Sequence, residues 1–198
     1  MPRNEEAGGG LRERTRRAVR TELAGLAMEM FLERGYDRTT VDDIAAAAGL
    51  SKRSFFRYFP SKEDVVFDGM DEIAEGIAAE LRARRGDEPA WECLHAVLSH
   101  WNDEIFGSLR KLAGLRLLES SPTLRAGLHV KRDELRARIT AALREREGCA
   151  LDAFTADLLT AAAGVALDTA DRAWLRSDGE ADRGELIDRA FALLAPRI

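Results

Sequence analysis

The sequence predicts an all-α protein, in which a three-helix head precedes a larger helical body and the chain holds about nine helices. Three observations support this fold. Apolar residues recur at the three- and four-residue spacing of amphipathic helices along most of the chain. No segment sustains the alternation of β-branched residues that marks a strand. Capping and stop residues divide the first third of the chain into short segments.

The first helix follows an expected disordered tail, residues 1–10, which contains three consecutive glycines. The helix should end at Gly35, where a positive φ is needed. Its apolar face consists of Val19, Leu23, Leu26, Ala27, Met30 and Phe31. Its outer face carries Arg12, Arg14, Arg16, Arg17 and Arg20.

Two short helices come next. Thr40 and Asp43 have the spacing of a capping box and should begin the second helix. Gly49 then breaks the chain, and Ser51 is placed to cap a third helix that runs to about Phe59. Two short helices joined through a glycine form a candidate helix-turn-helix, so we expect a DNA-binding domain over residues 11–60.

The body is expected over residues 61–198. Pro60 ends the third helix, and Ser61 with Asp64 repeats the capping pattern for one long fourth helix. Pro89 suits the first turn of a fifth helix. The remaining predicted helices cover residues 109–119, a segment that begins near Pro122, and residues 153–176 and 183–195.

The composition is that of an ordinary globular protein, with 45% hydrophobic and 33% charged residues among 198. No apolar run reaches the length of a membrane span, and the N-terminus lacks the apolar core of a signal peptide. We therefore expect a cytoplasmic protein without a membrane partner. Cys93 and Cys149 form no CxxC pair, so reduced thiols are expected.

The net charge of −5 is distributed unevenly. Residues 1–62 hold 12 Lys and Arg against 9 Asp and Glu, a balance of +3, whereas residues 63–198 hold 18 against 26, a balance of −8. This asymmetry is more informative than the total, because it leaves the predicted head basic.

The stretch GLSKRSFFRYF, residues 49–59, interleaves aromatic rings with cations. In a helix-turn-helix the second helix enters the major groove, and neighbouring polar groups bind phosphates. Helical spacing turns Phe55 and Phe59 toward the first two helices, and the outward residues are Lys52, Arg53, Ser54 and Arg57. The alternative is an amphipathic helix whose charges face only water. DNA binding is favoured because four helix-boundary signals occur in one short span: the caps at Thr40 and Ser51, the turn at Gly49 and the stop at Pro60.

The stretch TTVDDIAAAAGLSKRSFFRYFPSKEDVV, residues 39–66, resembles the helix-turn-helix signature of the tetracycline-repressor (TetR) family of bacterial transcriptional regulators. The resemblance covers about residues 15–67. It rests on Gly35, Thr40, Ile44, Ala45, Gly49, Ser51, Phe59, Lys62 and Glu63. Resemblance to this family implies a homodimeric regulator, usually a repressor, whose C-terminal body binds a small molecule that releases it from DNA.

One position departs from the family pattern. Phe56 stands where the family often has a tyrosine that contacts phosphate, so we expect only an apolar contact there, to a sugar or a thymine methyl. Tyr58 can give its hydroxyl to a phosphate, and Lys62 can neutralise another. The predicted DNA-binding residues are Thr40, Ser51, Lys52, Arg53, Ser54, Phe56, Arg57, Tyr58 and Lys62.

A dimer needs an apolar interface, and the last two predicted helices offer one. Its predicted residues are Leu158, Ala162, Val165, Thr169, Ile187, Ala190, Phe191 and Leu194. The alternative is that these faces complete the core of one protomer. If they pair two copies, the reading helices should match successive major grooves, and the operator on double-stranded DNA should be near-palindromic.

A ligand cavity is expected in the body, suited to a small apolar or aromatic effector. The predicted lining residues are Phe67, Met70, His100, Trp101, Phe106 and Leu117. The alternative is that these large side chains form a packed core, which composition alone does not distinguish from a cavity wall.

Two other classes of protein remain open. A helical-bundle metalloprotein or enzyme is suggested by Glu92 and His95, with Cys93 and His100 nearby. A di-iron bundle needs that pair on two helices plus two further glutamates, and no nucleophile with a base appears. We therefore expect no metal, no cofactor and no enzymatic activity. The second alternative is a ligand- or partner-binding protein with a vestigial head.

Overall fold

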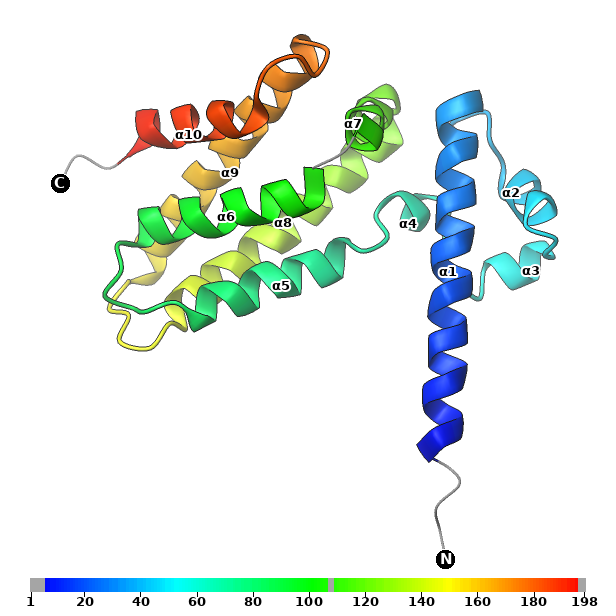
Figure 1. Ribbon diagram of the computed structural model, residues 1–198, viewed down its shortest axis with the longest axis horizontal. Helices are drawn as coiled ribbons and strands as arrows, with labels where there is room; N and C mark the ends of the chain where they lie inside the picture. Colours follow the sequence, from blue (N-terminus) through cyan, green and yellow to red (C-terminus); the bar gives the residue numbers. More distant parts are fainter. Residues whose placement is uncertain (1–5, 107–108, 196–198) are drawn as a thin grey trace, which may run out of the picture.

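The computed structural model describes residues 6–106 and 109–195, and the side chains of residues 12–102 and 112–195 (Figure 1). The described part of the chain is built from helices and contains no strand. The helices are α1 (Glu6–Arg34), α2 (Val41–Ala47), α3 (Lys52–Phe55), α4 (Glu63–Val66), α5 (Met70–Ala83), α6 (Ala90–Phe106), α7 (Leu109–Ser120), α8 (Pro122–Arg144), α9 (Ala153–Arg176) and α10 (Arg183–Leu194). The predicted all-α class with a three-helix head is confirmed.

Three boundaries differ from those expected. Helix α1 already begins at Glu6, so it includes residues 6–10 of the expected tail, whereas residues 1–5 lie outside the described residues. The predicted long fourth helix is divided into α4 and α5, because Gly69 adopts a left-handed conformation with φ 83°. Helix α3 ends at Phe55, but turn-type hydrogen bonds continue its helical path to Phe59.

The head has its own apolar core between α1, α2 and α3. Its fully buried members include Phe31, Ile44, Phe55 and Phe59. Four buried residues of the body complete this core: Val65, Phe67, Leu117 and Leu124. Figure 1 shows α4 and α7 beside α1, which is how body side chains reach the head. The head therefore rests on the body through a continuous apolar contact.

The body core lies between α5, α6, α8, α9 and α10. Trp91 joins α6 to α10, since its indole Nε1 donates to the Phe191 carbonyl at 3.2 Å and its ring lies 4.8 Å from that of Phe191. Gly76 of α5 allows Trp101 of α6 to approach closely, because a Cβ there would lie 2.2 Å from the indole ring. Among the described helices, none is long and apolar enough to cross a membrane.

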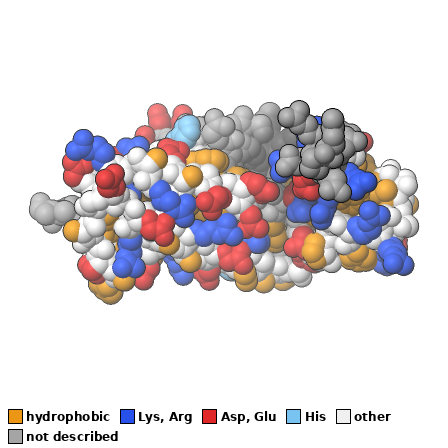
Figure 2. All heavy atoms as spheres, turned by 90° about the horizontal axis from the view of Figure 1, so that it is seen from below, with side chains coloured by type: hydrophobic (Ala, Val, Ile, Leu, Met, Phe, Trp, Pro, Cys, Tyr) orange, Lys and Arg blue, Asp and Glu red, His pale blue; other side chains and the backbone are white. Residues whose placement is uncertain are grey.

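The surface of the body mixes the two signs of charge. Figure 2 shows basic and acidic side chains interspersed along the body on the face seen from below. Many basic and acidic side chains of the body form ion pairs, among them Arg82 with Glu75 and Glu145, and Arg85 with Asp87. Exposed pairs of this kind contribute little to stability.

Candidate DNA-binding surface and ligand cavity

The second helix of the head begins at a capping box, as predicted. The Thr40 hydroxyl accepts from the Asp43 backbone N–H at 3.2 Å, and the Asp43 carboxylate accepts from the Thr40 N–H at 2.9 Å. The Thr40 hydroxyl also donates to the Asp43 carboxylate at 2.6 Å, and the hydrogen bonds that this carboxylate accepts from the hydroxyl and the N–H of Thr40 hold its pKa below the usual range. Thr40 is exposed at a helix N-terminus, where backbone dipoles favour an anion.

The turn between α2 and α3 depends on Gly49, which has φ 66°, a left-handed conformation that favours glycine. Leu50 then donates its N–H to the Ala45 carbonyl at 2.8 Å, which closes the turn. Ser51 caps α3, because its hydroxyl accepts from the Ser54 N–H at 3.1 Å. The turn therefore fixes the direction in which α3 leaves the head.

The inner face of α3 holds it against the head. Phe55 and Phe59 are both fully buried, with ring centroids 5.9 Å apart, so the prediction that they face inward is confirmed. Arg20 of α1 lies over the Phe59 ring at 4.7 Å and donates to the Tyr58 carbonyl at 3.3 Å. Arg20 also pairs with Asp68 at 2.7 Å, which joins α1 to the segment before Gly69.

The outer face of α3, taken with the turn that continues its helical path to Phe59, is exposed and basic. Lys52, Arg53 and Arg57 are exposed, and Phe56 keeps 45% of its surface open to solvent. The Lys52 ammonium pairs with Asp42 at 2.7 Å in an exposed contact. Such a contact is weak enough for a phosphate to replace the carboxylate. The structure thus brings the predicted cations of α3 onto one accessible surface.

Ser54 and Tyr58 are only partly exposed, and Lys62 is fastened to the head. The Lys62 ammonium donates to the carbonyls of Tyr36 and Thr39, at 3.0 and 3.2 Å, and lies 4.0 Å from the centre of the Tyr36 ring. These contacts give Lys62 a role in holding α4 to the α1–α2 loop.

Tyr36 makes a second link to α4, because its hydroxyl donates to the Glu63 carboxylate at 2.5 Å. Burial and this hydrogen bond raise the pKa of the Tyr36 phenol. Burial acts to raise the pKa of Glu63, but the hydrogen bonds it accepts outweigh burial and lower that pKa. The predicted Ser61–Asp64 capping contacts are also present, with the Ser61 N–H donating to Asp64 at 2.8 Å.

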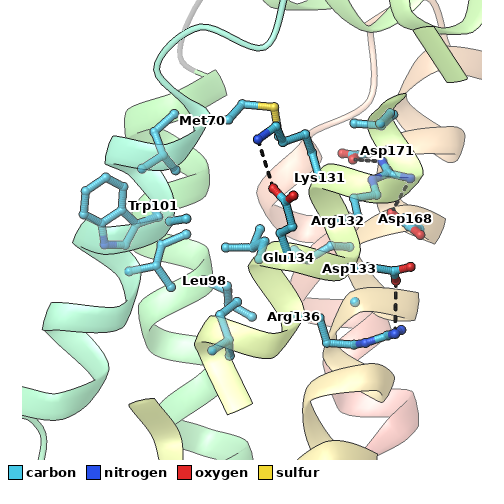
Figure 3. A pocket seen from close by; sticks show the side chains of 18 of the residues that line it. Met70, Leu98, Trp101, Lys131, Arg132, Asp133, Glu134, Arg136, Asp168 and Asp171 are labelled. Atoms are coloured by element: carbon cyan, nitrogen blue, oxygen red, sulfur yellow. Dashed lines mark hydrogen bonds and ion pairs between the residues drawn. The ribbon is translucent and has the colours of Figure 1, made fainter. Parts of the chain in front are cut away.

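A cavity of about 580 Å³ is bounded mainly by apolar side chains of α5 to α9, and it opens to solvent beside exposed residues of α8 and α9 (Figure 3). Two predicted lining residues, Met70 and Trp101, form part of its wall. Phe67 and Leu117 do not, because they are buried in the head core. His100 is exposed, 4.0 Å from Glu80, and the side chain of Phe106 lies outside the described residues.

One wall of the cavity is polar, and sequence reasoning missed it. The buried Arg183 donates to Asp171 through Nε at 2.8 Å, and Arg132 pairs with Asp168 at 2.9 Å. Figure 3 shows Arg132 between Asp168 and Asp171, on the side of the cavity opposite Met70 and Trp101. The two arginines and two aspartates balance in charge. These residues come from α8, α9 and α10, and no local motif joins them.

The predicted dimer residues fall into two groups. Leu158 and Val165 are each 57% exposed, and Thr169 and Leu194 are also exposed, whereas Ala162 and Ala190 are partly buried. Ile187 and Phe191, by contrast, are buried in the core of the protomer, where Phe191 meets Trp91. Sequence reasoning missed Phe154 and Leu193, both 76% exposed. The exposed residues lie on α9 and α10, two helices that pack against each other.

The residues considered for a metal site point to different places. Cys93 is buried in the body core, while His95 contacts Asp188 at 2.8 Å and lies against the Phe191 ring at 4.7 Å. Glu92 is exposed. In the described part of the chain, no three His, Cys, Asp or Glu side chains are placed to hold a metal ion.

Comparisons with known proteins agree with this geometry. A family model described as bacterial regulatory proteins of the tetR family matches residues 25–68, and a model described as the MftR C-terminal domain matches residues 93–198. The HTH-type transcriptional regulator TcmR of Streptomyces glaucescens is 35% identical over 158 residues, which cover 76% of this chain and 70% of TcmR. The chain belongs to the TetR family of bacterial regulatory proteins. It is therefore a DNA-binding transcriptional regulator.

Two further relatives extend the comparison for this TetR-family regulator. The HTH-type transcriptional repressor KstR2 of Rhodococcus jostii is 47% identical over 62 residues, which cover 31% of this chain and 28% of KstR2. The crystal structure of FadR from Bacillus subtilis in complex with stearoyl-CoA superposes with a TM-score of 0.63. It is 21% identical and covers 90% of this chain and 98% of FadR, so it supports the fold.

Proposed function

We propose that this TetR-family regulator is a repressor that leaves a near-palindromic operator when a small, largely apolar molecule fills the body cavity. The observation that carries this proposal is the cavity of about 580 Å³, a volume typical of small-molecule sites. The similarity of 62 residues of this chain to the repressor KstR2 supports repression. The fold it shares with a FadR bound to stearoyl-CoA is compatible with an apolar effector.

The exposed face of α3 is the proposed reading surface. Lys52, Arg53 and Arg57 are accessible cations on it, suited to guanine edges or phosphates, and Phe56 supplies an apolar contact. Thr40 and Ser51 sit at helix N-termini that favour phosphate. Ser54, Tyr58 and Lys62 complete the proposed set. A phosphate contact from Lys62 would use its remaining N–H donor.

The proposed dimer interface is the exposed apolar surface of α9 and α10. Leu158, Val165, Thr169 and Leu194 remain in it, joined by Phe154 and Leu193. Exposed apolar residues gathered on adjacent helices are typical of a protein–protein contact. A twofold axis through this surface would place two heads on one face of DNA.

Release from DNA follows as a population shift. The effector must bind more tightly to the conformation whose two reading helices do not match the spacing of successive major grooves. Equal affinity for both conformations would leave their populations unchanged. Val66 and Met70 line the cavity on either side of the break at Gly69. A molecule in the cavity therefore contacts both α4, which Lys62 and Glu63 fasten to the head, and α5 of the body.

The experiment is selection of bound sequences from a random duplex library by the purified protein at near-physiological salt. The expected result is enrichment of a near-palindrome, followed by release of that duplex when an effector is added. The Arg57→Ala variant should then bind more weakly and lower the slope of log affinity against log salt by about 1. Failure of the folded, dimeric protein to enrich any sequence would contradict the proposal.

A further inference from the structure

The cavity extends to the DNA-binding head. Five of its lining residues also pack against the head core: Met28, Val66, Met70, Leu118 and Leu128. Met28 belongs to α1, the first helix of the head, and it is only partly buried. The edge of the head core is therefore one wall of the cavity. This end of the cavity is formed by flexible or aliphatic side chains, which adapt to an apolar chain.

Helix α9 offers the cavity a polar group that lacks a partner. Thr160 of α9 is 3% exposed and lines the cavity, and its hydroxyl makes no hydrogen bond. It lies four and eight residues before Gly164 and Asp168, which also line the cavity, so it shares their face of the helix. A buried hydroxyl without a partner costs free energy, and a ligand that hydrogen-bonds to it recovers that cost.

The charges around Thr160 favour a ligand whose polar group is uncharged. Arg132 and Arg183 are paired with Asp168 and Asp171, so the wall holds equal numbers of cations and anions. A carboxylate or phosphate placed there would have to displace an aspartate from its arginine. A hydroxyl or carbonyl group makes the same hydrogen bond to Thr160 without that displacement.

We propose that the cavity binds an uncharged amphiphile, whose polar group bonds to Thr160 and whose aliphatic chain ends against Met28 of α1. The DNA-binding head then forms part of the effector site. The length of the ligand's aliphatic chain determines whether the ligand contacts α1. This inference rests on the proposed function, since it names the ligand class and the head contact of that same cavity.

The first test measures binding of straight-chain primary alcohols, from octanol to tetradecanol, by displacement of the uncharged fluorescent probe N-phenyl-1-naphthylamine from the full-length protein. Affinity should rise about fourfold for each added methylene until the chain reaches Met28, and then level off. In Met28→Ala the levelling should move to an alcohol two or three carbons longer, because the substitution removes three heavy atoms. Leu26→Ala is the matched control, since Leu26 packs on the head core without lining the cavity.

The second test separates a ligand contact from a structural role. Thr160→Val should weaken binding of every alcohol about tenfold, because it removes the hydroxyl at nearly constant shape. Thr140→Val should leave alcohol binding unchanged, since Thr140 is also a buried hydroxyl without a partner but lies outside the cavity lining. Both substitutions should raise the melting temperature of the free protein.

Operator binding is measured on the same preparations, so that two failures are told apart. Absence of alcohol binding, an unchanged levelling point in Met28→Ala, or equal effects of Thr160→Val and Thr140→Val would overturn this inference. If operator binding is intact in that case, the proposed repressor function stands. Loss of operator binding by the free wild-type protein would instead contradict the proposed function.

Discussion

Substituting the two adjacent phenylalanines of α3 one at a time should separate the stability of the head from its binding of DNA. Phe55 is fully buried in the head core, whereas Phe56 is 45% exposed and meets Phe55 edge-on at 5.6 Å. The same chemical change, Phe to Ala, therefore removes core packing at one position and surface contact at the next.

The magnitudes follow from burial. Truncating a fully buried phenylalanine costs about 3–5 kcal/mol of the free energy of unfolding, so Phe55→Ala should be severely destabilised. Burying a whole phenylalanine side chain is worth about 1.5–3 kcal/mol, and about half of Phe56 is buried, so Phe56→Ala should lose only about 1 kcal/mol. Operator affinity of Phe56→Ala should fall about fivefold if a similar apolar contact to DNA is lost.

The assay has two parts. Urea denaturation followed by circular dichroism gives the free energy of unfolding, at one protein concentration because dimer stability depends on concentration. Anisotropy of a labelled operator gives the affinity at one salt concentration. Phe55→Leu is the control for Phe55→Ala, since it restores most of the apolar volume and should restore most of the stability. Equal losses of stability in Phe55→Ala and Phe56→Ala would refute the reasoning.

Two further predictions concern the body and the head junction. Gly76→Ala should lower the free energy of unfolding by about 1–3 kcal/mol, because the new Cβ would overlap Trp101; Gly164→Ala, where the space is open, should be neutral or stabilising in the same denaturation assay. Folding lowers the pKa of Glu63, so the ionised Glu63 carboxylate stabilises the folded protein. This contribution is fully present above the usual pKa of 4.5, and it is lost as the pH falls through the lower pKa of the folded state. In Tyr36→Phe the melting temperature should change less between about pH 5 and pH 3, the range in which that contribution is lost. A pH profile equal to that of the wild-type protein would contradict a stabilising hydrogen bond from Tyr36 to Glu63.

Local signals were sufficient to predict the head. Thr40, Gly49 and Ser51 act through neighbours within four residues, so their spacing in the sequence already specifies the cap, the turn and the second cap. The break at Gly69 carried no comparable signal. Glycines at positions 25, 76, 114, 127 and 164 lie inside helices, so a glycine within a helical pattern does not by itself predict a break.

The body was harder to predict because its sites join distant segments. Apolar periodicity predicted one face on α10, but it does not distinguish a face that packs on its own chain, as Ile187 and Phe191 do, from one that meets a second copy. The polar wall of the cavity depends on Arg183 meeting Asp171 across a turn and on Arg132 arriving from another helix. Such meetings are decided by tertiary packing alone.

The four body residues in the head core limit how this regulator can be recombined with others. A chimaera cut at residue 60 would carry Phe55 and Phe59 but would leave behind the body's contribution to their core, so the transplanted head would expose apolar surface beneath α1. The residues left behind are Val65, Phe67, Leu117 and Leu124. Exchange of DNA specificity should therefore succeed by rewriting the exposed positions of α3 within this chain. Transfer of the whole head would require a recipient whose body offers the same four apolar contacts.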